Sequence, residues 1–258
     1  VKNNVKSFIK HKYKTNDIPL KKLKLQFVVD FDYYLKVEKK HKQITVNKNI
    51  QRFRKPIKVA VSEGYLDKDP FMLYKSKRVN KEVVFLSVEE LKHFEEFEFA
   101  QQRLQQVKDW FIFSCYTGLA YNEISNLQKQ HIVKGFDGEL WIEMKREKTQ
   151  KNISVPLLPK AKMLIEKYVN DNSEVIFDIC SNQRYNSYLK EIAGILGISK
   201  RLTTHTARKT FASTVLLYND VPMEIVSELL GHSSISITEE SYGKVVKRKV
   251  SEQINRLK

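Results

Sequence analysis

The sequence predicts an all-α domain followed by a mainly α domain with a small antiparallel β-sheet. Apolar side chains recur at helical spacing along most of the 258 residues, which is typical of amphipathic helices. The stretch 140–157 instead alternates apolar and polar residues in two short runs joined by a polar turn, as antiparallel strands do. A polar, basic connector at 75–84 separates the two parts.

Residues 1–76 are the predicted all-α domain. Apolar spacing over 3–14 and over 23–35 predicts two helices, the first with lysines on the face away from the core. Thr45 is the expected N-cap of a third helix that extends to Ala60. Proline lacks a backbone N–H, so Pro56 is expected to bend or interrupt this helix.

Basic charge is concentrated in this first domain. Residues 1–80 hold 21 Lys+Arg against 7 Asp+Glu, whereas residues 81–258 hold 25 against 23. This asymmetry predicts a domain that neutralises DNA phosphates, and a solvated lysine-rich surface is the alternative. The expected DNA contacts are the basic residues of the third helix and the connector, namely Lys48, Arg52, Arg54, Lys55, Lys58, Lys75, Lys77 and Arg78.

A linker is expected at 77–84, and the second domain at 85–258. Ser87 and Glu90 have the spacing of a capping box at the first helix of this domain. Further helices are predicted by apolar runs or spacing at 110–116, 161–169, 185–196 and, as a tail, 244–257.

The strand pair carries basic residues at the end of one face. Leu140, Ile142 and Met144 alternate along the first strand and form its predicted inward face. Arg146 and Lys148 continue that face, about 6–7 Å apart along the strand. The second strand returns over 153–157, so these cations are expected near the turn of a hairpin.

The candidate catalytic stretch, 203–242, begins with a short helix. Thr203 or Thr204 is its expected N-cap, and His205 and Arg208 lie three residues apart on one face. Free N–H groups and the helix dipole at this end favour an anion.

A second helix is predicted after the cap Asp220, with Pro222 in its first turn and Gly231 at its end. His232 then lies on a turn, and Tyr242 follows ten residues later. These pieces suit attack on a phosphodiester, because a phenol with a pKa of about 10 needs a polarised phosphate and a proton acceptor.

Each cationic or imidazole side chain has a plausible part in that attack. The planar guanidinium of Arg208 matches two phosphate oxygens and stabilises the charge of the transition state. His205 and His232 can donate to phosphate oxygens or carry the proton. The arrangement requires neither a metal nor another cofactor. Any one of these residues alone is more often structural, and it is the ordered set that favours catalysis.

At this point the residues resemble a family. His205-Thr206-Ala207-Arg208, Leu230-Gly231-His232 and Tyr242 are similar to the C-terminal box of the tyrosine recombinases, the phage-integrase family. The resemblance implies a SAM-like core-binding domain followed by an integrase catalytic fold. It also implies that Tyr242 forms a 3′-phosphotyrosyl bond with DNA, and that strands are exchanged through a Holliday junction without ATP.

The sequence departs from the family after Thr117-Gly118-Leu119, where most members have an arginine and this chain has Ala120. Losing one phosphate-binding donor costs about 3–4 kcal/mol of transition-state stabilisation. By resemblance Lys148 is the hairpin lysine, the general acid for the leaving 5′ oxygen. We expect Arg146, on the same strand face, to replace the missing arginine. This combination resembles integrases of Bacteroidetes conjugative transposons and related mobile elements.

Two other functions remain open from the sequence. DNA relaxation with type IB topoisomerase chemistry would use the same residues without pairing two sites. A catalytically silent, sequence-specific DNA-binding protein is suggested by Ala120. A metal-dependent nuclease is disfavoured because no carboxylate cluster is placed for a cation.

The expected partners are double-stranded DNA attachment sites, further copies of the chain in a tetrameric synapse, and a host DNA-bending protein. The sequence has two cysteines, no run of 18 apolar residues and no signal peptide, which favours a cytoplasmic, nucleoid-associated protein without a membrane partner. The family usually has a further N-terminal arm-binding domain. The chain is therefore expected to be either a piece of a longer protein or a naturally short recombinase.

Overall fold

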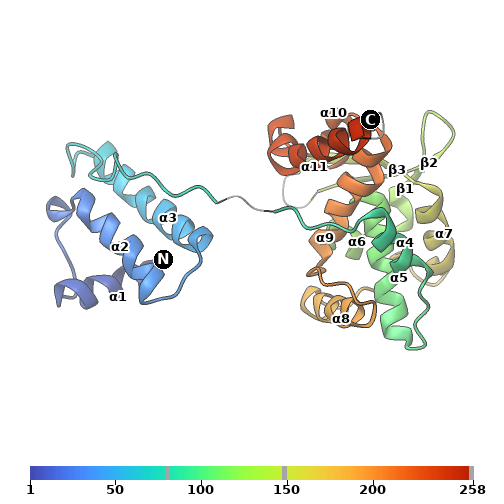
Figure 1. Cartoon of the computed structure of the whole chain (residues 1–258), viewed down its shortest axis with the longest axis horizontal. Coiled ribbons are helices and arrows are strands. Elements are labelled where there is room, and N and C mark those ends of the chain that lie inside the picture. The colour runs from blue at the N-terminus through green and yellow to red at the C-terminus, as the bar shows by residue number, and fades with distance from the viewer. Residues whose placement is uncertain (80–81, 147–149, 256–258) are drawn as a thin grey trace. The chain divides into compact units, whose positions relative to one another are not determined.

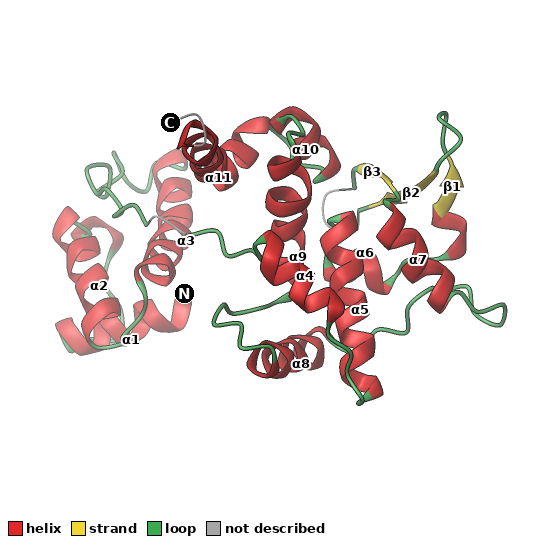
Figure 2. Cartoon of the chain, turned by 45° about the vertical axis from the view of Figure 1, so that its right-hand side comes forward, coloured by secondary structure: helices red, strands yellow, loops and turns green. Residues whose placement is uncertain are grey.

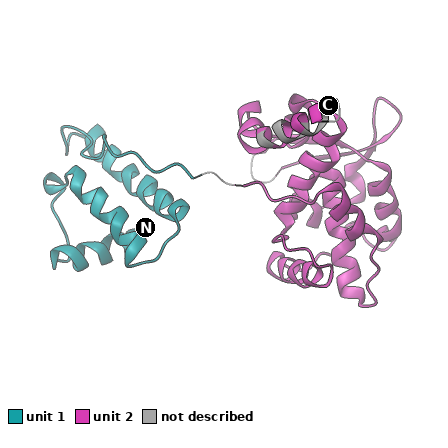
Figure 3. Cartoon of the chain, in the orientation of Figure 1, with its two compact units in different colours: residues 1–81 teal, residues 82–258 magenta. Residues whose placement is uncertain are grey.

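The computed structural model describes residues 1–79, 82–146 and 150–255, except for the side chains of 244, 247–249, 252 and 253 (Figure 1). Two compact units divide the chain, Val1–Lys81 and Glu82–Lys258 (Figure 3). The first is helical where it is described, and the second is mainly helical with one small sheet (Figure 2). The predicted fold class is confirmed.

The first unit packs its helices around a cluster of aromatic rings. Its elements are α1 (Lys2–Tyr13), the 3-10 turn η1 (Leu20–Lys22), α2 (Leu25–Val37) and α3 (Gln43–Ser62). Phe8 of α1 lies edge-on to Phe27 of α2 with ring centroids 5.1 Å apart. Phe53 of α3 and Phe71 of the following loop close the cluster at 5.6 Å. Such pairs add roughly 0.5–1.5 kcal/mol each beyond the area they bury.

Helix α3 differs from its prediction at two points. It begins at Gln43 rather than after Thr45, whose backbone N–H already donates to the Lys42 carbonyl at 2.8 Å. Pro56 lies inside the helix without interrupting it. Ile50 and Ile57 are buried on either side of Pro56, so core packing keeps the helix continuous despite the lost hydrogen bond.

The second unit surrounds the buried helix α5. Its elements are α4 (Val88–Glu96), α5 (Gln102–Thr117), α6 (Tyr121–Ser125), η2 (Lys129–His131), β1 (Ile132–Lys134), β2 (Leu140–Lys145), β3 (Asn152–Pro156), α7 (Pro159–Tyr168), α8 (Asn182–Ile195), α9 (Thr204–Thr210), the π-helix η3 (Phe211–Leu216), η4 (Leu217–Asn219), α10 (Met223–Leu229) and α11 (Ile235–Asn255). The expected capping box is present, since Ser87 Oγ accepts from the Glu90 N–H at 3.2 Å and Glu90 Oε2 accepts from the Ser87 N–H at 2.7 Å.

The sheet is antiparallel in the order β1-β2-β3. The hairpin was predicted, but β1 was not, because its three residues are too few to show alternation. Ile142 is fully buried opposite Val155, as expected of the inward face. Leu140 is 41% exposed, contrary to the prediction, because it lies at the outer end of β2 beyond the core. Strand β2 ends at Lys145, so Arg146 follows it directly.

The C-terminal helices position the residues singled out above. Thr203 caps α9 as predicted, and its Oγ1 accepts from the Thr206 N–H at 3.3 Å. Asp220 is not the N-cap of α10: it ends η4 as its C-cap in a left-handed conformation (φ 62°), and Pro222 is the residue before α10. Helix α11 is continuous through Tyr242 and Gly243, so the expected separate tail helix is the second half of a longer helix.

Gly118 ends α5 and is required in two ways. Its φ is +68°, and a Cβ built on it would lie 2.4 Å from Cδ1 of Phe211. Gly118→Ala is therefore expected to lower the free energy of unfolding by roughly 2–4 kcal/mol, from left-handed strain and overpacking. Urea unfolding measures this loss.

Gly194 provides the matched control for that substitution. It lies in α8, and, apart from its chain neighbours and the backbone of its own helix, no atom lies within 4 Å of its added Cβ. Gly194→Ala should raise stability by roughly 0.5–1 kcal/mol, because alanine loses less conformational freedom in a helix. Equal effects of the two substitutions would contradict the packing argument.

Candidate active site

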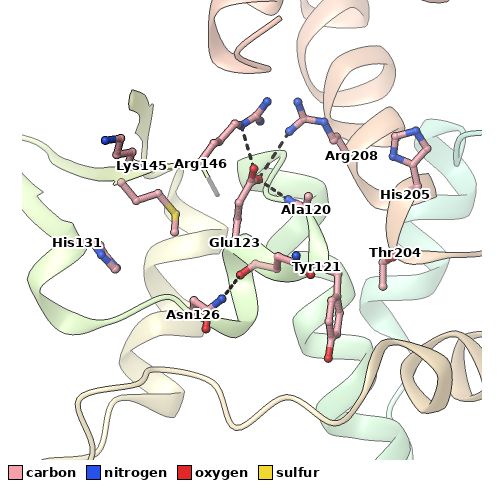
Figure 4. Close-up of a pocket in the computed structure, with 12 residues that line it drawn as sticks. Ala120, Tyr121, Glu123, Asn126, His131, Lys145, Arg146, Thr204, His205 and Arg208 are labelled. Atoms are coloured by element: carbon pink, nitrogen blue, oxygen red, sulfur yellow. Dashed lines mark hydrogen bonds and ion pairs between the residues drawn. The ribbon is translucent and has the colours of Figure 1, made fainter. Parts of the chain in front are cut away.

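Two arginines converge on one carboxylate at the centre of the site (Figure 4). Arg146 Nε lies 2.9 Å from Glu123 Oε1, and Arg208 Nη1 lies 4.0 Å from Glu123 Oε2. Glu123 Oε2 also accepts from the Ala120 backbone N–H at 2.7 Å. One acidic side chain therefore fixes the start of α6 and compensates two positive charges.

Arg208 is held by the ends of two helices. Its guanidinium donates to the carbonyls of Gly118 and Leu230, which lie just past α5 and α10 respectively. Carbonyls at helix C-termini lack helical partners and carry the negative end of the dipole, so they suit a cation. Arg208 is 7% exposed, and its position is set by contacts far apart in the sequence.

Arg146 depends on the glycine that ends α10. Its Nη1 donates to the Gly231 carbonyl at 3.4 Å. A Cβ on Gly231 would lie 3.1 Å from that same nitrogen, and the φ of +56° also favours glycine. Gly231 therefore both turns the chain and leaves room for Arg146, which is 8% exposed.

The close approach of the two guanidinium groups has an electrostatic cost. Burial, together with the charge of Arg146, lowers the pKa of Arg208 to about 10, while Glu123 opposes this shift. Arg208 therefore stays charged at neutral pH. Both arginines line the same cavity.

A cavity of about 550 Å³ opens beside this pair. Thr204, His205 and Arg208 of α9 form one wall, and His131 and Lys145 lie across from them (Figure 4). Ala120 and Arg146 also line this cavity.

The two candidate histidines are neutral at physiological pH. Desolvation and the charges of Lys209 and Arg208 lower the pKa of His205. Burial and the charges of Arg208 and Arg146 lower the pKa of His232 to about 4. A neutral imidazole can accept a proton, which suits a group receiving the phenol proton.

Tyr242 lies on α11 and is 5% exposed. Burial raises the pKa of its phenol, while the positive charge of Arg208 acts in the opposite direction. The phenol is therefore protonated at neutral pH and needs a proton acceptor to react.

The structure brings together Arg146, His205, Arg208, His232 and Tyr242, and leaves their catalytic roles as predictions. Lys148 lies outside the described residues. Glu123 was missed by the sequence analysis, although its place three residues after Ala120 follows the capping-box spacing. Lys151 was missed as well, and its Nζ donates to the His232 carbonyl at 3.3 Å.

The side chains predicted to contact DNA from the first unit differ in their exposure to solvent. Lys48, Arg52 and Lys55 are exposed at helical spacing on α3, so they lie on one face. Arg54 is instead partly buried in an ion pair with Asp69 at 2.7 Å. Exposed side chains are also found at Lys58, Lys75, Lys77 and Arg78.

Family models match both units of the chain. Residues 85–248 match the phage integrase family, and residues 1–79 match the phage integrase SAM-like domain. The chain belongs to the phage integrase family. Its fold and its enzyme class are therefore those of a tyrosine recombinase.

Relatives similar to this chain are described as tyrosine recombinases. A tyrosine recombinase of Pseudothermotoga lettingae is 26% identical over 253 residues, covering 94% of this chain and 85% of that protein. The tyrosine recombinase XerD of Oceanobacillus iheyensis is 26% identical over 230 residues, covering 82% and 75%.

Solved structures share the fold. The Tn1549 transposon integrase in complex with a circular intermediate DNA has a TM-score of 0.71 at 16% identity, covering 97% of this chain and 90% of that one. A lambda integrase dimer bound to a core site has a TM-score of 0.70 at 17% identity, covering 93% and 87%.

The described residues offer neither a metal cluster nor a membrane-spanning helix. Among them, no group of three or more His, Cys, Asp or Glu side chains is placed to hold a metal ion. Within the same residues, no helix is long and apolar enough to cross a membrane.

The lowered pKa of His232 predicts a pH dependence of stability. In the unfolded chain a histidine titrates near 6.5, whereas His232 in the fold titrates at about 4. Between these values the unfolded state binds the extra proton, so stability falls as pH falls through this window. His232→Asn should therefore lose less stability between pH 6.5 and 4 than the wild type in urea unfolding.

His205 also has a lowered pKa and is still present in the His232→Asn variant. The variant is therefore expected to keep some decrease of stability as the pH falls. A proton NMR titration of the His232 ring supplies the direct measurement. A midpoint near 6.5 would contradict the assignment.

Proposed function

We propose that this tyrosine recombinase cleaves and rejoins DNA at specific sites with Tyr242 as its nucleophile. One observation carries the proposal: the guanidinium groups of Arg146 and Arg208 converge beside a cavity lined by His205. Two fixed cations at one point fit the non-bridging oxygens of a scissile phosphate, where charge builds during the attack.

The reaction balances without an external energy source. The Tyr242 oxygen bonds to phosphorus, its proton passes to a neutral histidine, His205 or His232, and the bond from phosphorus to the 5′ oxygen breaks. Lys148 would protonate that leaving oxygen. The resulting 3′-phosphotyrosyl bond is then attacked by the 5′-hydroxyl of a partner strand, which releases the tyrosine. Because one phosphoester replaces another, neither ATP nor a metal is required.

Arg146 takes the place of the arginine that most family members carry where this chain has Ala120. Its ion pair with Glu123 at 2.9 Å and its nearness to Arg208 support this assignment, since a guanidinium from the end of β2 reaches the space beside Ala120. The site then has two arginines, as the chemistry requires. Arg208 comes from α9, and Arg146 comes from the end of β2.

The setting we infer is a mobile element. Strand exchange pairs two duplexes, so four copies of the chain would act together through a Holliday junction, with a host DNA-bending protein assisting. The basic face of α3 supports clamping of the duplex by the first unit. The Tn1549 transposon integrase among similar structures supports the mobile-element setting, and the finer Bacteroidetes affinity rests on the sequence pattern. We infer a cytoplasmic location with the nucleoid, because DNA is the substrate.

A trapping assay tests the proposal. The chain is incubated with nicked attachment-site DNA, and a covalent adduct is sought on a denaturing gel. Wild type should form the adduct and Tyr242→Phe should form none. Arg146→Ala should slow adduct formation by about 10²–10³-fold, the effect of removing one oxyanion donor.

Two variants control for indirect effects. Arg146→Lys should recover part of the rate, because it restores the charge without the bidentate fork. Arg103→Ala removes an arginine paired with Glu191 at 2.7 Å on the surface, and should cleave at the wild-type rate. Specific DNA binding by wild type without any adduct would instead indicate a silent DNA-binding protein.

The basic face of α3 predicts the salt dependence of DNA binding. Replacing Lys48, Arg52 and Lys55 with alanine should reduce the slope of log affinity against log salt by roughly 0.9 for each phosphate that the protein no longer neutralises. Fluorescence anisotropy with labelled duplex measures the slope. Lys36→Ala is the control, because Lys36 lies on α2 and already pairs with Asp32. An unchanged slope in the triple variant would exclude this face from DNA binding.

A further inference from the structure

One hydroxyl group links a candidate catalytic histidine to the helix that carries the nucleophile. His232 Nδ1 and Thr238 Oγ1 lie 2.7 Å apart, which is hydrogen-bonding distance. Thr238 is fully buried in the first turns of α11. It precedes Tyr242 by four residues, so the two side chains lie on the same face of that helix.

The backbone of His232 is fixed separately from its ring. Its N–H donates to the Ser227 carbonyl at 3.0 Å, which ties it to α10, and its carbonyl accepts from Lys151 at 3.3 Å. These contacts hold the main chain and do not reach the imidazole. The ring itself hydrogen-bonds to Thr238.

When Nδ1 is hydrogen-bonded, the protonation and the direction of the second ring nitrogen, Nε2, are defined as well. Which nitrogen of a neutral histidine carries the proton is set by the hydrogen bond that the other one makes. The ring also lies within electrostatic reach of Arg208 and Arg146, so its environment is the proposed phosphate site. Helices α10 and α11 lie side by side, which brings histidine and threonine together across the turn between them (Figures 1 and 2).

We propose that Thr238 is a positioning residue: its hydroxyl holds the His232 imidazole in one orientation beside α11, the helix that carries Tyr242. This inference rests on the proposed cleavage chemistry. Thr238 has no chemical step of its own, and it acts through the His232 ring that it hydrogen-bonds.

The test is a double-mutant cycle on single-turnover adduct formation with nicked DNA. Thr238→Val keeps the shape and removes the hydroxyl, and should slow adduct formation about tenfold, the scale of one hydrogen bond. Thr238→Ser should restore most of the rate. In a His232→Ala background, Thr238→Val should cause no further loss, because the ring it orients is gone.

Thr214→Val is the matched control. Thr214 is a buried threonine of the same unit that donates to the Leu86 carbonyl, so its replacement removes a hydrogen bond outside the site. Its effect on the rate, if any, should be the same with and without His232. Equal slowing by Thr238→Val in both backgrounds, or no slowing at all, would overturn the inference.

A second measurement separates this inference from the proposed function. If wild type forms no adduct, the cleavage chemistry fails, and the hydrogen bond is decided by an NMR titration of the His232 ring. Its midpoint should move in Thr238→Val and stay unchanged in Thr214→Val. An unmoved midpoint in both would show that the threonine does not hold the ring.

Discussion

Two buried guanidinium groups can lie side by side in this protein because a single carboxylate lies between them. Uncompensated, two like charges with little exposure would repel strongly and would each lose hydration. Glu123 supplies the compensation to Arg146 and Arg208, and it also accepts the N–H that starts α6. The strand end after β2, the short helix α6 and helix α9 are therefore held in one arrangement by this carboxylate.

The ends of the helices around the site serve a similar double purpose. Arg208 bonds to carbonyls just past α5 and α10, groups that every helix leaves without helical partners. Gly118 and Gly231 end these helices in left-handed conformations that bring the carbonyls to the arginines. The same residues thus end the helices and hold the arginines, so a substitution at a helix end affects both the stability of the fold and the geometry of the site.

The ends of several helices were predictable from the sequence. Capping residues such as Ser87 and Thr203, and the terminating Gly231, act through neighbours within a few positions, so a single stretch reveals them. The pairings of Glu123 with Arg146 and of Arg54 with Asp69 were not predictable, because each joins residues that only the fold brings together. A separate tail helix was expected after Gly243, but the cost of about 1 kcal/mol for a helical glycine is outweighed by the burial of Tyr242 and Val245 on either side.

The continuity of α11 has a mechanical consequence. Asn255, where α11 ends, lies thirteen positions after Tyr242, a length of about 20 Å at 1.5 Å per residue. A helix without a break moves as a stiff rod, so displacement of its distal half pivots the tyrosine rather than being absorbed in a hinge. A load on the distal half of α11 would therefore be transmitted to Tyr242, because no break in the helix lies between them.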